Sequence, residues 1–337
     1  MNQTVTIICD ANDSTGLGHL LRCISLAQGL QQIRIESLFM GDFGIQAQEL
    51  IRYFGFTCIN QTATVSGWLQ TLTVTSPIVI DRYDCHEQAI VGFSNVLLID
   101  DFCQLQRYHV KGVINFTLEA NQYDYVHKGA ASQALGIQYF LKHPSLSLAK
   151  KPFTKQVKRV LILIGSGDKY FLAPLFVKAL QSINSSLEVK VVGLRKHYQH
   201  SQVKPNTNHP YCVNLLGRHM SFIKPTPDID SLYEWADFCI TSGGLAKYEC
   251  AYLQMPSSAV ALTSQESKEN REFSGKNLTF DLGFYQTGSV FKWQLRLQRV
   301  LGSFRLRKQA YQACKEAFQA NSQLRAAKYV RDCLFGE

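Results

Sequence analysis

A turn with two glycines and a histidine forms the first candidate site. Gly16 and Gly18 allow a tight turn after an apolar run, and His19 follows at the start of an amphipathic stretch. The first N–H groups of a helix attract an anion, and the same positive end favours a neutral imidazole able to accept a proton. Arg22, on the same side of the helix, can pair with Asp13 or with a phosphate. A plain glycine turn with a capping histidine explains these residues equally well.

A second glycine-rich turn follows an apolar run in the second half of the chain. It reads Ser242-Gly243-Gly244-Leu245 and opens a helical stretch that carries Glu249 about a turn and a half further on. Successive N–H groups suit a diphosphate, and the carboxylate suits ribose hydroxyls. The alternative is an ordinary strand-to-helix turn with a surface glutamate. Two such turns, one in each half, indicate a nucleotide-diphosphate ligand more strongly than either does alone.

Two further groups of polar residues follow apolar runs. Gly165-Ser166-Gly167-Asp168 is expected either to line the ligand site or to supply Asp168 as a helix N-cap. Asp81 and Tyr83 follow one run of the first half, and Asp100-Asp101 follow the next. Paired carboxylates suggest a metal or an acid/base pair, but no His or Cys spacing supports a metal. We therefore expect one Asp to order its loop and Tyr83 or Asp81 to face the ligand.

Short apolar runs alternate with amphipathic stretches, which is typical of βαβ units. Strands are expected at 5–9, 35–39, 77–80, 96–99, 112–114, 159–164, 187–192, 220–223, 238–241 and 258–262. The fold class is therefore α/β, with two Rossmann-like domains and a ligand cleft between them. The expected boundaries are 1–148 for the domain with the catalytic histidine, 149–290 for nucleotide binding, and 291–337 for a basic helical extension.

The composition is that of an ordinary globular protein, with 46% hydrophobic and 18% charged residues among 337. No apolar stretch is long enough to span a membrane, and the N-terminus reads as a strand and not as a signal peptide. The ten cysteines form no Cys-x-x-Cys motif. We therefore expect reduced, mostly buried thiols and a cytoplasmic location.

The excess positive charge is concentrated near the C-terminus. Between Lys292 and Asp332 there are ten Lys or Arg residues and two acidic ones, in a chain with a formal net charge of +9. Nucleic acid is not expected as a partner, because no aromatic-basic recognition module accompanies the charge. The favoured interpretation is a pair of solvated basic helices. The alternative is a docking face for an acidic partner or an anionic membrane.

In order and rough spacing, these motifs resemble those of the PseG family, the UDP-2,4-diacetamido-2,4,6-trideoxy-β-L-altropyranose hydrolases of pseudaminic acid biosynthesis. The likeness covers about residues 5–285. The opening motif of that family is similar to Gly16-Leu-Gly18-His19-Leu-Leu-Arg22, and its two acidic segments to Asp81-Arg-Tyr83 and Asp100-Asp101. Its Gly-Gly-x-Asp loop is similar to Gly165-Ser166-Gly-Asp168. Its nucleotide-binding segment, shared more widely with GT-B glycosyltransferases, is similar to Ser242-Gly-Gly…Glu249.

The resemblance implies a GT-B-like fold and hydrolysis without a metal or cofactor. His19 would activate water for attack on the anomeric carbon, while Gly243, Gly244 and Glu249 hold the diphosphate and ribose of the leaving UDP. Near the sugar, where the family has an Asn-Gln pair, this chain has Ser264-Gln265. The identity of the sugar, and uridine rather than cytidine, are therefore left open.

The favoured function is a nucleotide-sugar hydrolase of nonulosonic acid or surface polysaccharide biosynthesis. Two other functions fit the same residues. In a GT-B glycosyltransferase, His19 would deprotonate a glycan or lipid-linked acceptor in place of water. A nucleotide-sugar-binding protein without catalysis is the third interpretation, and the presence of both His19 and Gly243-Gly244 argues against it.

Overall fold

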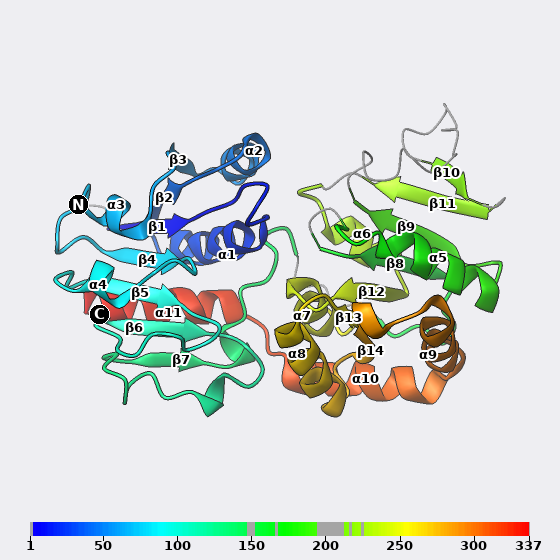
Figure 1. The fold of residues 1–337 in the computed structure, drawn as a ribbon. Helices are drawn as coiled ribbons and strands as arrows, with labels where there is room; N and C mark the ends of the chain where they lie inside the picture. Colours follow the sequence, from blue (N-terminus) through cyan, green and yellow to red (C-terminus); the bar gives the residue numbers. More distant parts are fainter. Residues whose placement is uncertain are drawn as a thin grey trace. The chain divides into compact units, whose positions relative to one another are not determined.

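The computed structural model describes residues 3–146, 152–165, 168–193, 212–215, 218–223 and 226–336. Contacts divide the chain into two compact units, Met1–Pro144 with Gln319–Glu337, and Ser145–Phe318. Each unit is built on a seven-stranded sheet with helices packed against it (Figure 1). The α/β prediction is thus confirmed.

The N-terminal unit has an all-parallel sheet of order β3-β2-β1-β4-β5-β6-β7. Its strands are β1 (Thr4–Cys9), β2 (Glu36–Gly41), β3 (Thr57–Asn60), β4 (Ile78–Asp81), β5 (Val96–Ile99), β6 (Gly112–Asn115) and β7 (Gln133–Leu135). Its helices are α1 (Gly18–Gln32), α2 (Ile45–Tyr53), α3 (Val65–Leu69), α4 (Glu87–Ile90) and α11 (Ser322–Phe335), with short 3₁₀ turns η1 (Ala120–Gln122) and η2 (Ile137–Tyr139). The central strands are wholly buried, as parallel strands covered on both faces must be.

The C-terminal unit repeats this plan with the order β10-β11-β9-β8-β12-β13-β14, in which only the β10–β11 pair is antiparallel. Its strands are β8 (Arg159–Leu163), β9 (Glu188–Val192), β10 (Cys212–Leu215), β11 (Arg218–Ile223), β12 (Phe238–Ser242), β13 (Ser257–Ala261) and β14 (Phe280–Phe284). Its helices are α5 (Leu172–Ile183), α6 (Asp230–Trp235), α7 (Leu245–Tyr252), α8 (Ser264–Gly275), α9 (Val290–Gly302) and α10 (Phe304–Ala317), with a 3₁₀ turn η4 (Tyr285–Thr287).

All ten strands expected from the apolar runs are present. The four additional strands are β3, β7, β10 and β14, and each is the outermost strand of its sheet. An edge strand buries less surface than a central one and therefore needs a less apolar sequence. β3 illustrates this, because none of its four residues is buried.

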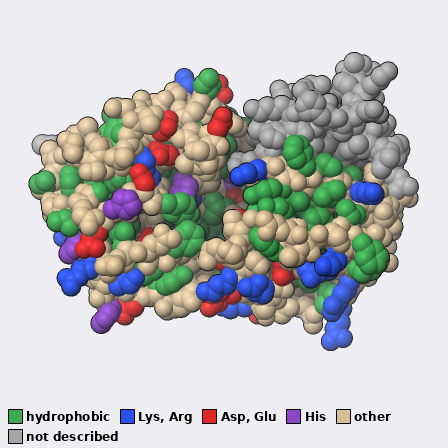
Figure 2. Space-filling view, viewed as in Figure 1, with side chains coloured by type: hydrophobic (Ala, Val, Ile, Leu, Met, Phe, Trp, Pro, Cys, Tyr) green, Lys and Arg blue, Asp and Glu red, His purple; other side chains and the backbone are tan. Residues whose placement is uncertain are grey.

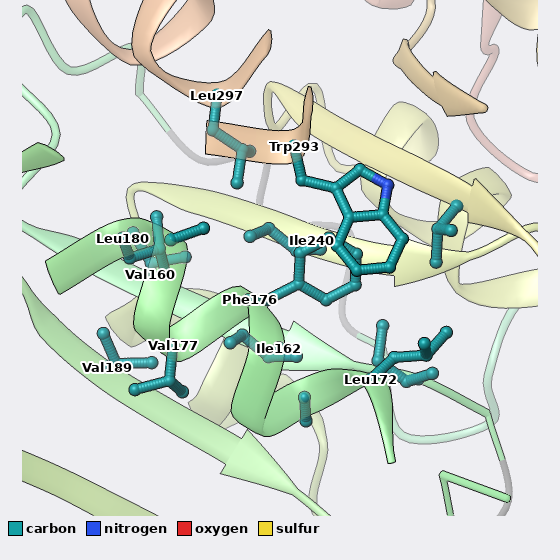
Figure 3. Close-up of a cluster of buried hydrophobic side chains, with 14 of the residues drawn as sticks. Val160, Ile162, Leu172, Phe176, Val177, Leu180, Val189, Ile240, Trp293 and Leu297 are labelled. Carbon is teal, nitrogen blue, oxygen red and sulfur yellow. The ribbon is translucent and has the colours of Figure 1, made fainter. Parts of the chain in front are cut away.

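Residues 291–337 do not form one extension, in contrast to the expected boundary. Helix α9 packs against α5 in the core of the C-terminal unit, where the Trp293 ring lies 4.7 Å from that of Phe176 (Figure 3). Helix α11 packs on α1 in the N-terminal unit, where a Cβ on Gly29 would lie 2.9 Å from the Gln323 carbonyl oxygen. Each helix has an apolar stripe, and burying that stripe requires a partner.

The nine cysteines whose side chains are described are all free thiols, and six of them are buried. No helix among the described residues combines the length and the hydropathy that crossing a bilayer would require.

Candidate functional site

The polar residues predicted around His19 come together at one edge of the N-terminal sheet. β1 and β4 are neighbours, with Cys9 paired to Asp81, and the strand order reverses between them. Ligands of open α/β sheets bind at such a switch point, outside the carboxyl ends of the strands. α1 begins there, so its first two turns place His19 and Arg22 beside the end of β4.

His19 forms a close pair with Asp81. Its Nδ1 lies 2.7 Å from Oδ1 of the carboxylate, and 15% of the imidazole side chain is exposed. An ionised carboxylate only accepts hydrogen bonds, so Nδ1 carries a proton, and in the neutral ring Nε2 then keeps a free lone pair. The Tyr83 ring meets the imidazole edge to face, with 4.6 Å between the centroids. The pair can therefore act as a base oriented by a carboxylate.

Arg22 is buried and held by two carboxylates. Its Nε and Nη2 donate to Asp81 at 2.6 and 2.5 Å, and its Nη1 donates to both oxygens of Asp101 at 3.1 and 2.8 Å. Burial acts to raise the pKa of Asp81, but the Arg22 charge, together with hydrogen bonds from Arg22 and His19, outweighs it and holds that pKa well below its usual range. Asp81 is therefore a fixed anion. Arg22 was expected to pair with Asp13 or a phosphate, and in the structure it pairs with Asp81 and Asp101.

The two adjacent carboxylates after β5 have different functions in the fold. Asp100 accepts hydrogen bonds from the N–H groups of Phe102 and Cys103 at 2.8 and 3.0 Å, and from the Tyr108 hydroxyl. It orders its loop, as predicted for one of the two. Asp101 turns towards Arg22 and also accepts the Tyr83 hydroxyl at 3.1 Å. The sequence marked Asp100 and Asp101 as a pair, but it did not show which of them would join the His19 group.

The loop before α1 is ordered by its own polar side chains. Asn12 accepts hydrogen bonds from the N–H groups of Ser14 and Thr15 at 2.9 and 3.1 Å, and Gly16 has the left-handed backbone (φ +73°) that favours glycine. Beside this loop is an open hollow of about 580 Å³. It is lined by Asn12, Asp13, Ser14, Gly44, Ile45 and Gln46.

The C-terminal unit also brings its glycine loops together at a switch point. β8 and β12 are neighbours, Leu163 pairs with Thr241, and the strand order reverses there. Gly165 has φ +58°, and a Cβ at this position would lie 3.6 Å from Oγ of Ser242. Ser166 lies outside the described residues. Asp168 is a helix cap, because its two oxygens accept the N–H groups of Leu172 and Ala173, both at 2.8 Å.

The Gly243-Gly244 turn lies against the start of α8. A Cβ on Gly243 would come within 2.5 to 2.9 Å of the Glu266 side chain, whereas one on Gly244 would have only Ser242 Oγ nearby, at 3.9 Å. Glu266 is fixed there because its Oε2 accepts the Leu262 N–H at 2.6 Å. The predicted residues Ser264 and Gln265 form the first turn of α8, with Ser264 exposed and Gln265 half-buried, and Leu245 is the first residue of α7. These predicted residues therefore share one edge of the sheet.

Glu249 lies on α7 and is 8% exposed, so it is not a surface glutamate. Its Oε2 accepts the hydroxyl of Tyr233 at 2.6 Å. Burial and the Glu249 carboxylate raise the pKa of Tyr233, so this hydroxyl remains a donor.

Known proteins resemble this chain in sequence and in fold. No family model matches the chain. It is 22% identical over 277 residues to the Helicobacter pylori protein named pseudaminic acid cytidylyltransferase and UDP-2,4-diacetamido-2,4,6-trideoxy-beta-L-altropyranose hydrolase, covering 80% of this chain and 46% of that protein. It is 20% identical over 205 residues to the spore coat polysaccharide biosynthesis protein SpsG of Bacillus subtilis, covering 58% of this chain and 57% of that one. The chain thus spans about half the length of the curated relatives it matches.

The crystal structure of Acinetobacter baumannii MurG superposes with a TM-score of 0.67 at 14% identity, over 98% of this chain and 99% of that one.

The chain is PseG-like, with a GT-B-like fold. The resemblance seen in its motifs is confirmed by the Helicobacter match, and the fold is confirmed by the MurG superposition.

Lys247 is a feature of this PseG-like chain that sequence reasoning missed. It is wholly buried in α7, and its ammonium lies 3.0 Å from Glu269 and 3.2 Å from Asn270 on α8. Burial lowers its pKa. The available signal was its spacing, because Lys247 precedes the buried Cys250 and Ala251 by three and four residues and so lies on their face of the helix. This ion pair joins α7, which begins at the glycine turn, to α8, whose first turn lies against it.

In the described part of the chain, no group of three or more His, Cys, Asp or Glu side chains is arranged to hold a metal ion.

Proposed function

We propose that the chain hydrolyses a nucleotide sugar, releasing UDP and a free sugar of the diacetamido-trideoxy type for nonulosonic acid or surface polysaccharide biosynthesis in the cytoplasm. The observation that carries the proposal is the 2.7 Å contact between His19 Nδ1 and Asp81. It leaves Nε2 as a proton acceptor in the first turn of a helix at a switch point. The names of the Helicobacter and Bacillus relatives, which include a UDP-sugar hydrolase and polysaccharide biosynthesis, support the substrate class.

The reaction would be a single displacement. Nε2 of His19 takes a proton from water as the water oxygen bonds to the anomeric carbon, and the bond from that carbon to the diphosphate oxygen breaks. UDP leaves with the bonding electrons. Asp81 stabilises the imidazolium that forms, as the aspartate does in a Ser-His-Asp triad. The backbone at Gly16 and Gly18 and the Tyr83 hydroxyl are the proposed sugar contacts on this side.

The C-terminal unit would hold the leaving group. The N–H groups at Gly243, Gly244 and Leu245 start α7 and suit the diphosphate, with Gly165, Ser166 and Ser242 as further contacts. Glu249, shared with Tyr233, is the proposed ribose acceptor. Ser264 and Gln265, at the start of α8, are the proposed sugar contacts of this unit. No metal or cofactor is required for these roles.

The test supplies candidate UDP- and CDP-sugars without an acceptor and measures release of nucleotide and free sugar. Steady turnover that falls to background in His19→Ala supports hydrolysis. The matched control is His86→Ala, an exposed histidine in the same unit, which is expected to retain wild-type turnover. Turnover that survives in His19→Ala contradicts the proposed base.

The alternative is transfer of the sugar to an acceptor, and one observation favours it. The hollow of about 580 Å³ lies between the loop that leads into α1 and the start of α2, and its size suits part of an acceptor. A transferase would release free sugar only slowly and would accelerate when a glycan or lipid-linked acceptor is added. Binding of a nucleotide sugar with no turnover under either condition would instead indicate a binding protein.

A further inference from the structure

Helix α9 has two unlike faces. Trp293, Leu297 and Val300 form its buried stripe in the core of the C-terminal unit. On the opposite side, Phe291 is 67% exposed and Leu295, one turn later, is 51% exposed. Packing in the core explains why Trp293, Leu297 and Val300 are apolar. It does not explain why Phe291 and Leu295 are apolar.

Positive charge lies beside the two exposed apolar residues. Lys292, Arg296 and Arg299 are exposed on the same helix, and Phe304 and Arg305 are exposed at the start of α10. Residues 290–308 contain six Lys or Arg and no Asp or Glu. Figure 2 shows Lys and Arg side chains gathered with hydrophobic ones over α9. We call Phe291, Lys292, Leu295, Arg296 and Arg299 the α9 outer face.

We propose that the α9 outer face docks on an anionic lipid bilayer, with Phe291 and Leu295 entering the interface and the three cations meeting lipid phosphates. Interfacial helices combine these features: exposed apolar side chains, flanking Lys and Arg, and no acidic residue. Both apolar side chains are exposed on the side of α9 opposite its buried stripe, where they can enter a lipid surface. No described helix is able to cross the bilayer, so the contact is peripheral. The inference does not depend on the proposed reaction.

The test is co-sedimentation of the full chain with vesicles of phosphatidylcholine alone or mixed with phosphatidylglycerol, at low and high salt. We expect binding only to the mixed vesicles, and less of it at high salt. Lys292→Glu with Arg296→Glu should weaken this binding by about 30-fold or more. Phe291→Ser with Leu295→Ser should weaken it by about tenfold, because the lost apolar contacts act independently of charge.

The matched control is Lys178→Glu with Lys276→Glu, which makes the same charge change at exposed positions on α5 and next to α8. It should bind vesicles as wild type does. All the substituted side chains are exposed, so an unchanged thermal midpoint shows that each variant is folded. Sugar release from a soluble substrate should be the same in every variant, which separates this inference from the proposed function.

Four outcomes would overturn the inference. The first is equal or no binding of wild type to both kinds of vesicle. The second is loss of binding in the control equal to that in the α9 variants. The third is unchanged binding of the serine variant. That result would show that charge alone holds the chain on the vesicle and that the apolar side chains do not enter the lipid. The fourth concerns polyglutamate as a competitor. If it displaces the chain from vesicles, and if the serine variant binds polyglutamate as tightly as wild type does, the partner is an acidic protein and not a lipid surface.

Discussion

Nδ1 of His19 lies 2.7 Å from Oδ1 of Asp81, a residue 62 positions further along the chain. Asp81 is a positioning residue in the proposed reaction, because it fixes the tautomer of His19 and stabilises the imidazolium. Asp81→Asn should therefore lower kcat by about 10³- to 10⁴-fold while KM changes little. Steady-state kinetics of sugar release measure both constants.

The matched control for this variant is Asp84→Asn. Asp84 is three residues further on, pairs with Arg82 and is more exposed than Asp81. Its substitution should leave kcat within a few-fold of wild type. A nearly normal kcat in Asp81→Asn would exclude His19 as a base oriented by this carboxylate.

Arg22 is expected to be a stability determinant. Arg22→Met leaves Asp81 and Asp101 buried without their shared cation, at an expected cost of about 3–5 kcal/mol in the free energy of unfolding. Without the cation, the pKa of the Asp81 carboxyl should rise in the folded state. Protonation would then favour folding, so the deficit should shrink as the pH falls from 7 towards 5.

Urea denaturation of wild type and Arg22→Met at several pH values tests this expectation. Arg52→Met, which removes an exposed arginine on α2, is the control and should stay within about 0.5 kcal/mol of wild type. A deficit that is constant or grows at lower pH would contradict the carboxylate explanation.

The two adjacent glycines of the second turn should respond differently to alanine. Gly243→Ala places a Cβ within 2.5 to 2.9 Å of Glu266, so it should destabilise the fold by about 1–3 kcal/mol. Gly244→Ala meets only Ser242 Oγ at 3.9 Å and should keep its stability. If this turn holds the diphosphate, Gly244→Ala should nonetheless weaken UDP binding by about tenfold.

Thermal unfolding and calorimetric titration with UDP and with uridine separate the two effects. Uridine lacks the diphosphate, so its affinity should be the same in Gly244→Ala and in wild type. Unchanged UDP affinity in this variant would place the diphosphate elsewhere.

His143 should make stability depend on pH. It is 8% exposed, and burial, with the nearby Lys142 charge, lowers its pKa to about 4. Between the unfolded value near 6.5 and about 4, the unfolded chain binds more protons than the folded one. The free energy of unfolding should therefore fall as the pH falls through this window, by up to about 3 kcal/mol.

Denaturation at pH 7, 6, 5 and 4 measures this loss. His143→Gln removes the titrating group, so the variant should lose less stability over the same window than wild type does. Parallel curves for the two proteins would show that other groups account for the acid sensitivity.

The sequence by itself determined the elements and the placement of the glycine turns. All ten expected strands are present because a central strand of a parallel sheet is buried on both faces, and this burial appears directly as an apolar run. The strands that were missed lie at the sheet edges, where fewer side chains are buried and the sequence therefore contains shorter apolar runs. The turns around Gly16 and Gly243 could be found because backbone sterics act over a few residues.

Tertiary structure alone decided which side chains meet. Arg22 was expected to pair with Asp13 or with a phosphate, but the neighbouring positions of β1, β4 and β5 bring it to Asp81 and Asp101, 59 and 79 residues away. The division of the basic C-terminal helices, with α9 in one unit and α11 in the other, is equally non-local. An apolar stripe shows that a helix needs a partner, but the partner is chosen by complementary packing between segments far apart in the chain.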